Sequence, residues 1–359
     1  MEVELDDTLL TARPCEELAV LAICALGWAE RHRVLPRNQT AWDAWAKTLP
    51  RDLADQVELV WKESRRRSIQ GPRSEQVRVV PTSSNLFDQQ PIVLTPREAL
   101  NLLGRPLRVF LENGRYDRAF LLAFADEATR KVLLHAEQAG WLVFETAGGI
   151  TELVARALDA ATHPAPREAF RTMYQCDSDA REPGKPEDPA DSINKSLVEL
   201  GLRYGRPPAH FGMVLTRRAA ENYAPPGEVL TWAANNFGKQ AFELIQQAKT
   251  SQERAVLTIG TGNAGSQRRH VLAAIALREL EQDKKGAVLA HLDMKNGRLY
   301  KGNLRNAQVI WDQLDAFQQA ALEDGFGASF SDAFYRNRRS LRDSSGEISP
   351  FLAKLVERV

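Results

Sequence analysis

The sequence has few cysteines and no long apolar run. Only three cysteines occur among 359 residues, Cys15, Cys24 and Cys176, and none forms a C-x-x-C pair, so neither a disulfide framework nor a thiolate zinc site is predicted. The chain shows no run of eighteen apolar residues and no basic start followed by an apolar core, so neither a membrane span nor an export signal is indicated. We expect a cytoplasmic protein that does not bind membranes.

Net charge and a nucleotide-binding motif are also missing. The 47 basic and 47 acidic residues cancel, so any contact with nucleic acid must come from local clusters. No G-x-x-x-x-G-K-[ST] sequence occurs, so hydrolysis of ATP through a P-loop is not expected. The 43% hydrophobic and 26% charged residues are typical of a globular protein with one large or two ordinary domains.

Three regions differ in their patterns. Residues 1–80 carry leucines and tryptophans at helical spacing and predict a helical N-terminal domain. Prolines and serines between residues 71 and 95 surround a predicted short strand, VRVV at residues 77–80, and indicate a domain boundary. Residues 95–230 alternate between strand and helix patterns, and residues 231–359 predict a mostly helical C-terminal extension that completes the site.

The middle region predicts a small parallel sheet flanked by helices, which is an α/β fold. Strands spaced by helices of ten to twenty residues pair in parallel through crossovers. The expected strands are residues 107–112, 141–145, 170–177 and 210–215, and the expected helices between them are about 117–136 and 151–161.

Acidic residues fall where two of these strands end. Glu112 closes LRVFLE, and Asp177 and Asp179 follow a later strand as C-D-S-D. Ligands of open parallel sheets bind beyond the carboxyl ends of the strands, so these carboxylates converge if their strands are neighbours. Alternate residues of an extended segment point the same way, so both aspartates are expected to face the site. Oxygen ligands without Cys or His select a hard ion, Mg²⁺ or Mn²⁺.

Four segments together resemble the successive motifs of a Toprim domain. They are LRVFLENGRYD, AGGI, YQCDSDA and VLTRRAAENYAPP. The sequence is most similar to Toprim nucleases of the overcoming-lysogenization-defect family and to the Toprim effector of PARIS-type antiphage systems. The resemblance extends over roughly residues 95–330 at the level of motifs.

The resemblance implies a metal-dependent endonuclease of bacterial defence that cleaves DNA, or tRNA as the less favoured substrate. It assigns the metals to Glu112, Asp177 and Asp179, with Glu221 as an additional acid. It also implies a functional lysine at Lys295. Related effectors act with a separate ABC- or SMC-like ATPase, so such a partner is expected, and the N-terminal domain could serve in docking or in a homodimer.

Arginines near these motifs are candidates for substrate binding, because phosphate contacts position a nucleic acid without reading its sequence. They are Arg115, Arg217 and Arg218, with ion pairing as the alternative role for each. The basic run of residues 336–342 is a candidate flexible tail that contacts phosphate.

Several alternatives stay open. The spacing in E-N-G-R-Y-D is one residue longer than the common E-G-x-x-D, so Asp117 could instead cap the following helix. Residues 260–265, GTGNAG, match a dinucleotide motif but lie late in the chain and have no second nucleotide-binding half. The rival functions are a non-catalytic Toprim-fold partner of an ATPase and a topoisomerase or primase activity.

Overall fold

The computed structural model describes most of the chain outside its C-terminal third. The described residues are 1–11, 14–29, 31–70, 75–82, 86–163, 165–180, 185–237 and 330–359, together with 276, 314, 315 and 319. The GTGNAG segment and Lys295 lie outside the described residues.

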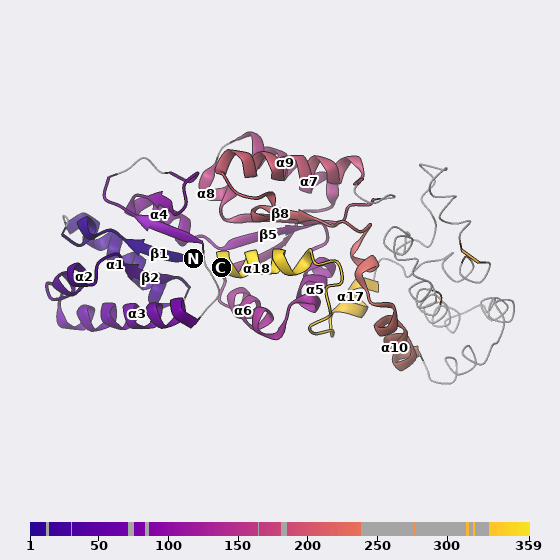
Figure 1. The fold of residues 1–359 in the computed structure, drawn as a ribbon, viewed down its shortest axis with the longest axis horizontal. Coiled ribbons are helices and arrows are strands. Elements are labelled where there is room, and N and C mark those ends of the chain that lie inside the picture. The colour runs from indigo at the N-terminus through magenta and orange to yellow at the C-terminus, as the bar shows by residue number, and fades with distance from the viewer. Residues whose placement is uncertain are drawn as a thin grey trace.

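Two four-stranded parallel sheets organise the described chain (Figure 1). Sheet A has the order β2-β1-β3-β4 and is formed by β1 (Glu2–Leu5), β2 (Arg33–Pro36), β3 (Gln76–Val79) and β4 (Ile92–Leu94). Sheet B has the order β6-β5-β7-β8 and is formed by β5 (Leu107–Leu111), β6 (Leu142–Thr146), β7 (Thr172–Cys176) and β8 (Gly212–Val214). The α/β prediction is therefore confirmed at the level of fold class.

The first 80 residues are not all helical, contrary to the expectation from sequence. Three of the strands of sheet A lie there, each with four residues, and apolar and polar side chains alternate in β1 and β3. The surrounding elements are η1 (Asp7–Thr11), α1 (Pro14–Trp28), α2 (Gln39–Ala46) and α3 (Arg51–Gln70). The short strand predicted at residues 77–80 is confirmed as β3, and β4 also lies between residues 71 and 95. α4 (Pro96–Leu103) packs against α1.

Sheet B follows the predicted strands and helices closely. The predicted helix 117–136 is two helices, α5 (Gly114–Phe124) and α6 (Glu127–Gln138), because Asp126 caps a new helix by accepting a hydrogen bond from the Thr129 amide at 2.7 Å. The later elements are α7 (Ile150–Thr162), α8 (Pro166–Ala169), α9 (Asp188–Tyr204), η2 (Pro208–His210), η3 (Ala220–Tyr223) and α10 (Pro226–Phe237).

Helices cover both faces of sheet B. In Figure 1, α7, α8 and α9 lie on one face, and α5, α6 and α18 (Ile348–Arg358) lie on the other. α17 (Phe330–Tyr335) packs against α5 near the carboxyl ends of the strands. The chain therefore returns from its C-terminal region to the central sheet.

The predicted flexible basic tail is packed instead. Within residues 336–342, the Leu341 amide donates to the Ala123 carbonyl at 2.8 Å, and the Arg338 guanidinium carbon lies 4.7 Å from the centre of the Phe334 ring. Arg336 is ion-paired with Asp332. The apolar neighbours of this run hold it against α5 and α17.

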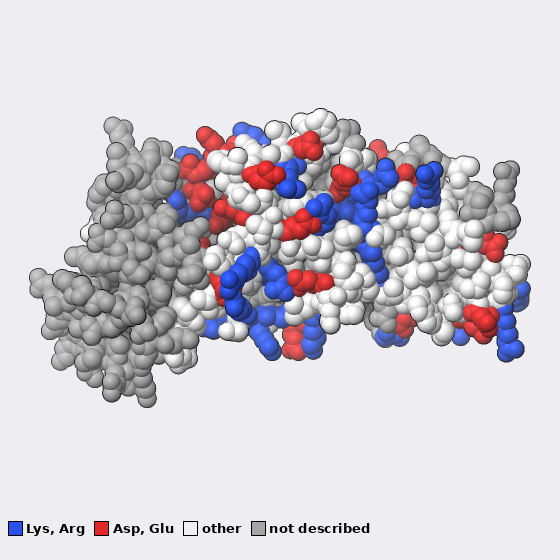
Figure 2. All heavy atoms as spheres, turned by 180° about the vertical axis from the view of Figure 1, so that it is seen from behind, with Lys and Arg blue, Asp and Glu red and all other residues white. Residues whose placement is uncertain are grey.

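Basic and acidic side chains are interspersed over the described part of the face shown in Figure 2. This distribution agrees with the formal net charge of zero. Within the described residues, no helix is long and apolar enough to cross a membrane.

Candidate active site

The order of sheet B places the candidate site at a reversal in strand order. β5 is first in sequence in this sheet, with the next strand, β6, on one side and the third, β7, on the other. Leu111 pairs with Gln175 in the parallel register. The chain segments that carry Glu112 and Asp177 therefore leave the same edge of the sheet as neighbours, at the position where open α/β sheets bind ligands.

Asp177 is the centre of a group of carboxylates. Burial, the largest cause, and four surrounding carboxylates raise the pKa of Asp177 well above its usual value. These carboxylates, in decreasing order of effect, are Asp117, Glu221, Glu112 and Asp179. The structure thus brings together all four acids that the sequence assigned to metal binding and adds a fifth, Asp117. We call these five residues the carboxylate cluster.

Asp117 is not the cap of the helix that contains it. Asn113 occupies the N-cap position of α5, and Asp117 lies one turn further along, buried, with Oδ2 accepting a hydrogen bond from the Asn113 amide at 2.8 Å. The longer E-N-G-R-Y-D spacing is absorbed by the first turn of the helix. Asp117 therefore faces Asp177 despite the additional residue.

Hydrogen bonds to backbone groups of residues 217–220 hold the segment that follows β7. The Ser178 hydroxyl donates to the Arg217 carbonyl at 2.7 Å, and the Asp179 amide donates to the Arg218 carbonyl at 2.8 Å. The Ala220 amide donates to Asp177 Oδ1 at 3.0 Å. These contacts bring η3, and with it Glu221, beside Asp177.

The two aspartates of D-S-D do not point the same way, contrary to the expectation. β7 ends at Cys176, and Asp179 has a φ of 49°, in the left-handed region. Asp177 is partly buried, whereas Asp179 is exposed. The alternation of an extended strand does not continue past Cys176, so Asp179 lies at the rim of the cluster.

α17 completes the walls of the cluster. The sequence predicted that the C-terminal extension would complete the site through Lys295, which lies outside the described residues, but it did not point to α17. The Ser331 hydroxyl donates to Glu221 Oε1 at 2.9 Å, and the buried Tyr335 hydroxyl donates to the Ala220 carbonyl at 2.7 Å. Phe330, Phe334 and Tyr335 are all buried. The polar Ser331 therefore lies in a segment that is rich in aromatic core residues.

The three arginines predicted to bind substrate have different surroundings. Arg115 is exposed and lies 2.7 Å from an Asp332 oxygen. The Arg217 guanidinium donates to the Asn222 carbonyl at 2.7 Å and packs over the Tyr223 ring. Arg218 is buried and donates to the Asp179 carbonyl at 3.2 Å, so its position supports the loop rather than a solvent-facing phosphate contact.

The carboxylate oxygens of the cluster are ligands of the type that a hard cation binds. All five members of the carboxylate cluster offer oxygen atoms, which Mg²⁺ and Mn²⁺ prefer. In the described part of the chain, however, no three Asp, Glu, His or Cys side chains are already placed to hold one ion. The cluster supplies the ligands, and their side chains would have to reorient around a bound cation.

The chain was compared with known proteins. No family model matches the sequence, and comparisons with curated proteins and with solved structures give no significant match.

Proposed function

We propose that this chain is a metal-dependent hydrolase of phosphodiester bonds in nucleic acid. The observation that carries the proposal is the convergence of four carboxylates on Asp177 at the reversal in strand order of sheet B. Negative charges gathered in a partly buried place repel one another unless a cation joins them. A fold gains nothing from such a cluster, which indicates a functional reason for it.

Different residues of the chain would have different roles in this reaction. Glu112, Asp177, Asp179 and Glu221 would hold Mg²⁺ or Mn²⁺, which when bound supplies Lewis-acid stabilisation of the charge on phosphate. The Ala220 amide and the Asn113 amide orient Asp177 and Asp117 by the hydrogen bonds described above. Arg115, exposed on α5 beside Asp332, would contact a flanking phosphate.

The finer parts of the proposal rest on the motif resemblance. A Toprim nuclease of antiphage defence, DNA as the favoured substrate, tRNA as the second and an ATPase as partner all follow from the similarity of the motifs. The order of sheet B, with its first strand next to the third, is compatible with that family assignment.

The test is a cleavage assay with purified full-length protein. Plasmid DNA and total tRNA are incubated with the protein in Mg²⁺, Mn²⁺ or EDTA, beside Glu112→Gln and Asp177→Asn. Glu127→Gln is the matched control, because Glu127 is exposed on α6 and paired with Lys131. We expect metal-dependent cleavage that both site variants lose and the control keeps. Binding without cleavage would favour a non-catalytic partner of an ATPase.

A further inference from the structure

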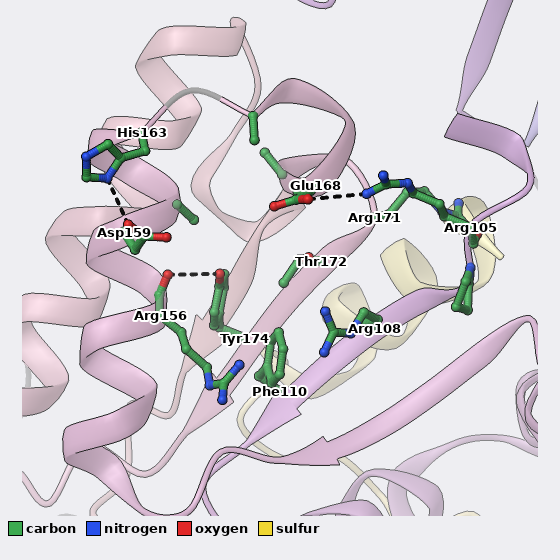
Figure 3. A pocket seen from close by; sticks show the side chains of 14 residues that line it. Arg105, Arg108, Phe110, Arg156, Asp159, His163, Glu168, Arg171, Thr172 and Tyr174 are labelled. Atoms are coloured by element: carbon green, nitrogen blue, oxygen red, sulfur yellow. Dashed lines mark hydrogen bonds and ion pairs between the residues drawn. The ribbon is translucent and has the colours of Figure 1, made fainter. Parts of the chain in front are cut away.

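A pocket lies on sheet B towards the amino-terminal ends of the strands that lead to the carboxylate cluster. It opens over β5 and β7, beside α7 and α8, with a volume of about 460 Å³ (Figure 3). This volume is within the range of small-molecule sites. None of the residues that line the pocket belongs to the carboxylate cluster, so the two are separate.

The register of sheet B puts a charged residue on the pocket face of a central strand. Arg108 pairs with Thr172 and Phe110 with Tyr174, so these four side chains form two rows on one face of the sheet. Central parallel strands are usually apolar on both faces, but Arg108 is exposed and ion-paired with Glu145 of β6. This part of the face is therefore open to a ligand and is not packed in the core.

Aromatic rings hold two guanidinium groups at the pocket. The rings of Phe110 and Tyr174 stack with centres 5.8 Å apart. The guanidinium carbons of Arg108, from β5, and Arg156, from α7, each lie 4.8 Å from the centre of the Phe110 ring. A guanidinium that packs over a ring can still donate from its edge to an oxyanion, and Arg156 is the candidate for this because Glu145 already engages Arg108.

Positive charge is in excess around the pocket. Arg171 belongs to the lining, but its guanidinium donates to the Arg358 carbonyl of α18 at 2.7 Å and so points away from the cavity. The other charged side chains of the lining are three arginines, Arg105, Arg108 and Arg156, and two carboxylates, Asp159 and Glu168. This excess of positive charge favours an anionic ligand.

The existing ion pairs at the rim are easily exchanged. Arg105 contacts Glu168 at 3.3 Å and Arg156 contacts Glu152 at 3.2 Å, in both cases through half-exposed side chains. Exposed pairs of this kind contribute little to stability, so a ligand could take over both arginines. Arg108 differs, because two hydrogen bonds to Glu145, at 2.5 and 2.6 Å, fix its guanidinium.

We propose that this pocket binds a small phosphate monoester whose organic part packs against the apolar floor, a mononucleotide in chemical class. The arginines of the rim take the phosphate, and the floor around Tyr174 and Ala160 takes the organic part. Phosphate alone would leave most of the cavity unfilled.

The test is calorimetric titration of the full chain with adenosine 5′-monophosphate, adenosine and inorganic phosphate. We expect saturable binding of the monophosphate, at least tenfold weaker binding of the other two, and a loss of at least tenfold in Arg105→Gln and Arg156→Gln. Arg167→Gln is the matched control, since Arg167 lies on α8 with a similarly exposed ion pair, to Glu98, outside the pocket. Glu112→Gln should bind like the wild type, which separates this site from the proposed cleavage.

Four results would overturn the assignment. The first is that the folded wild-type protein does not bind the monophosphate. The second is equal binding of adenosine, which would exclude recognition of the phosphate. The third is unchanged binding of the monophosphate in both arginine variants. The fourth is a short single-stranded DNA that binds through these arginines while the monophosphate does not.

Discussion

Asp177 illustrates at the scale of one residue how a functional group can cost stability. In the native structure its burial, and next the charge of four surrounding carboxylates, raise its pKa. In the unfolded chain these groups separate, so their repulsion burdens only the folded state. Removing the charge of Asp177 should therefore stabilise the protein in the absence of metal.

The first prediction concerns Asp177→Asn. The substitution keeps the oxygen that accepts the Ala220 amide but removes the charge. In EDTA we expect the variant to unfold at a temperature about 2 °C higher than the wild type, which corresponds to a gain of ~1 kcal/mol in the free energy of unfolding. Metal-dependent cleavage should fall by more than about 100-fold, because a ligand is lost. Scanning calorimetry and the cleavage assay measure the two effects.

The control for this prediction is Asp55→Asn, at an exposed position of α3. It should leave both the unfolding temperature and cleavage unchanged. A lower unfolding temperature for Asp177→Asn would mean that a cation of the chain stabilises this carboxylate, and the metal proposal would lose its physical basis.

Sequence patterns located the acids at strand ends but not the residues behind them. Glu112 and Asp177 could be predicted to converge because the parallel sheet dictates where strands end. Ser331 could not, because its contact with Glu221 spans 110 positions and depends on the packing of α17. The role of Asp117, as a helix cap or as part of the acidic site, could not be decided from the sequence. One additional residue in the turn changes the direction in which its side chain leaves the helix.

At the scale of elements, a single carboxylate fixes the start of α18. Asp343 Oδ1 accepts from the Gly346 amide at 2.9 Å, and Oδ2 accepts from the Ile348 and Ser349 amides at 3.0 Å each. Burial acts to raise the pKa of Asp343, but hydrogen bonds from Ser345, Ser349 and Gly346 outweigh it and lower that pKa below its usual value. The ionised form is therefore the one that stabilises the helix start.

The second prediction follows from this cap. Asp343→Ala should lower the free energy of unfolding by about 1–2 kcal/mol at neutral pH. The contribution is present above the unfolded pKa of Asp and disappears as the pH falls through the lowered folded value, so wild type and variant should converge in acid. Urea unfolding at a series of pH values measures this. Asp55→Ala serves as the exposed control, and a pH-independent difference would contradict the argument.

The third prediction concerns the turn between β5 and α5. A Cβ at Gly114 would lie 2.2 Å from Thr146 Oγ1 and 3.1 Å from the Thr146 amide nitrogen, so the turn that carries Glu112 and Asp117 would have to move. Gly114→Ala should cost about 1–3 kcal/mol and reduce cleavage. Gly227→Ala, where a Cβ meets open space in α10, should be neutral or slightly stabilising. Equal effects of the two substitutions in thermal unfolding would exclude the close approach as the cause.

The elements of sheet A were harder to predict than those of sheet B. The strands of sheet B stand between clear helices, and β3 was predicted because prolines and serines separate VRVV from the helices. β1 and β2 were missed, because each has only four residues and the helical pattern around them, as in α1 and α3, is stronger. Their pairing partners lie far apart in sequence, and only the assembled sheet shows that Val3 lies beside Val34 and Val77.

At the scale of the whole molecule, the two sheets repeat one strand order and share a core. In each sheet the first strand lies between the second and the third, with the fourth beyond the third. One cluster of buried apolar side chains runs from sheet A to the face of sheet B that is covered by α7 and α9. Phe87 and Phe170, with ring centres 5.5 Å apart, belong to this junction.

A buried ion pair crosses the same junction and supports the fourth prediction. Glu75, just before β3, lies 3.1 Å from Arg206, which follows α9, and the two side chains are 11% and 2% exposed. Removing one partner of such a pair leaves an uncompensated buried charge. Glu75→Gln should therefore cost about 3–5 kcal/mol. Glu4→Gln, which breaks the half-exposed pair with Arg78 within sheet A, should cost at most about 1 kcal/mol.

A double variant separates the charge from the junction itself. In Glu75→Leu with Arg206→Met no charge is left unpaired, so part of the stability should return, although the carbonyl of Gln89, which accepts from Arg206 at 2.7 Å, loses its donor. Urea unfolding followed by tryptophan fluorescence compares the four proteins. Two separate transitions in Glu75→Gln would show that this pair couples the sheets. A midpoint shift no larger than that of Glu4→Gln would show that the shared apolar core alone holds them together.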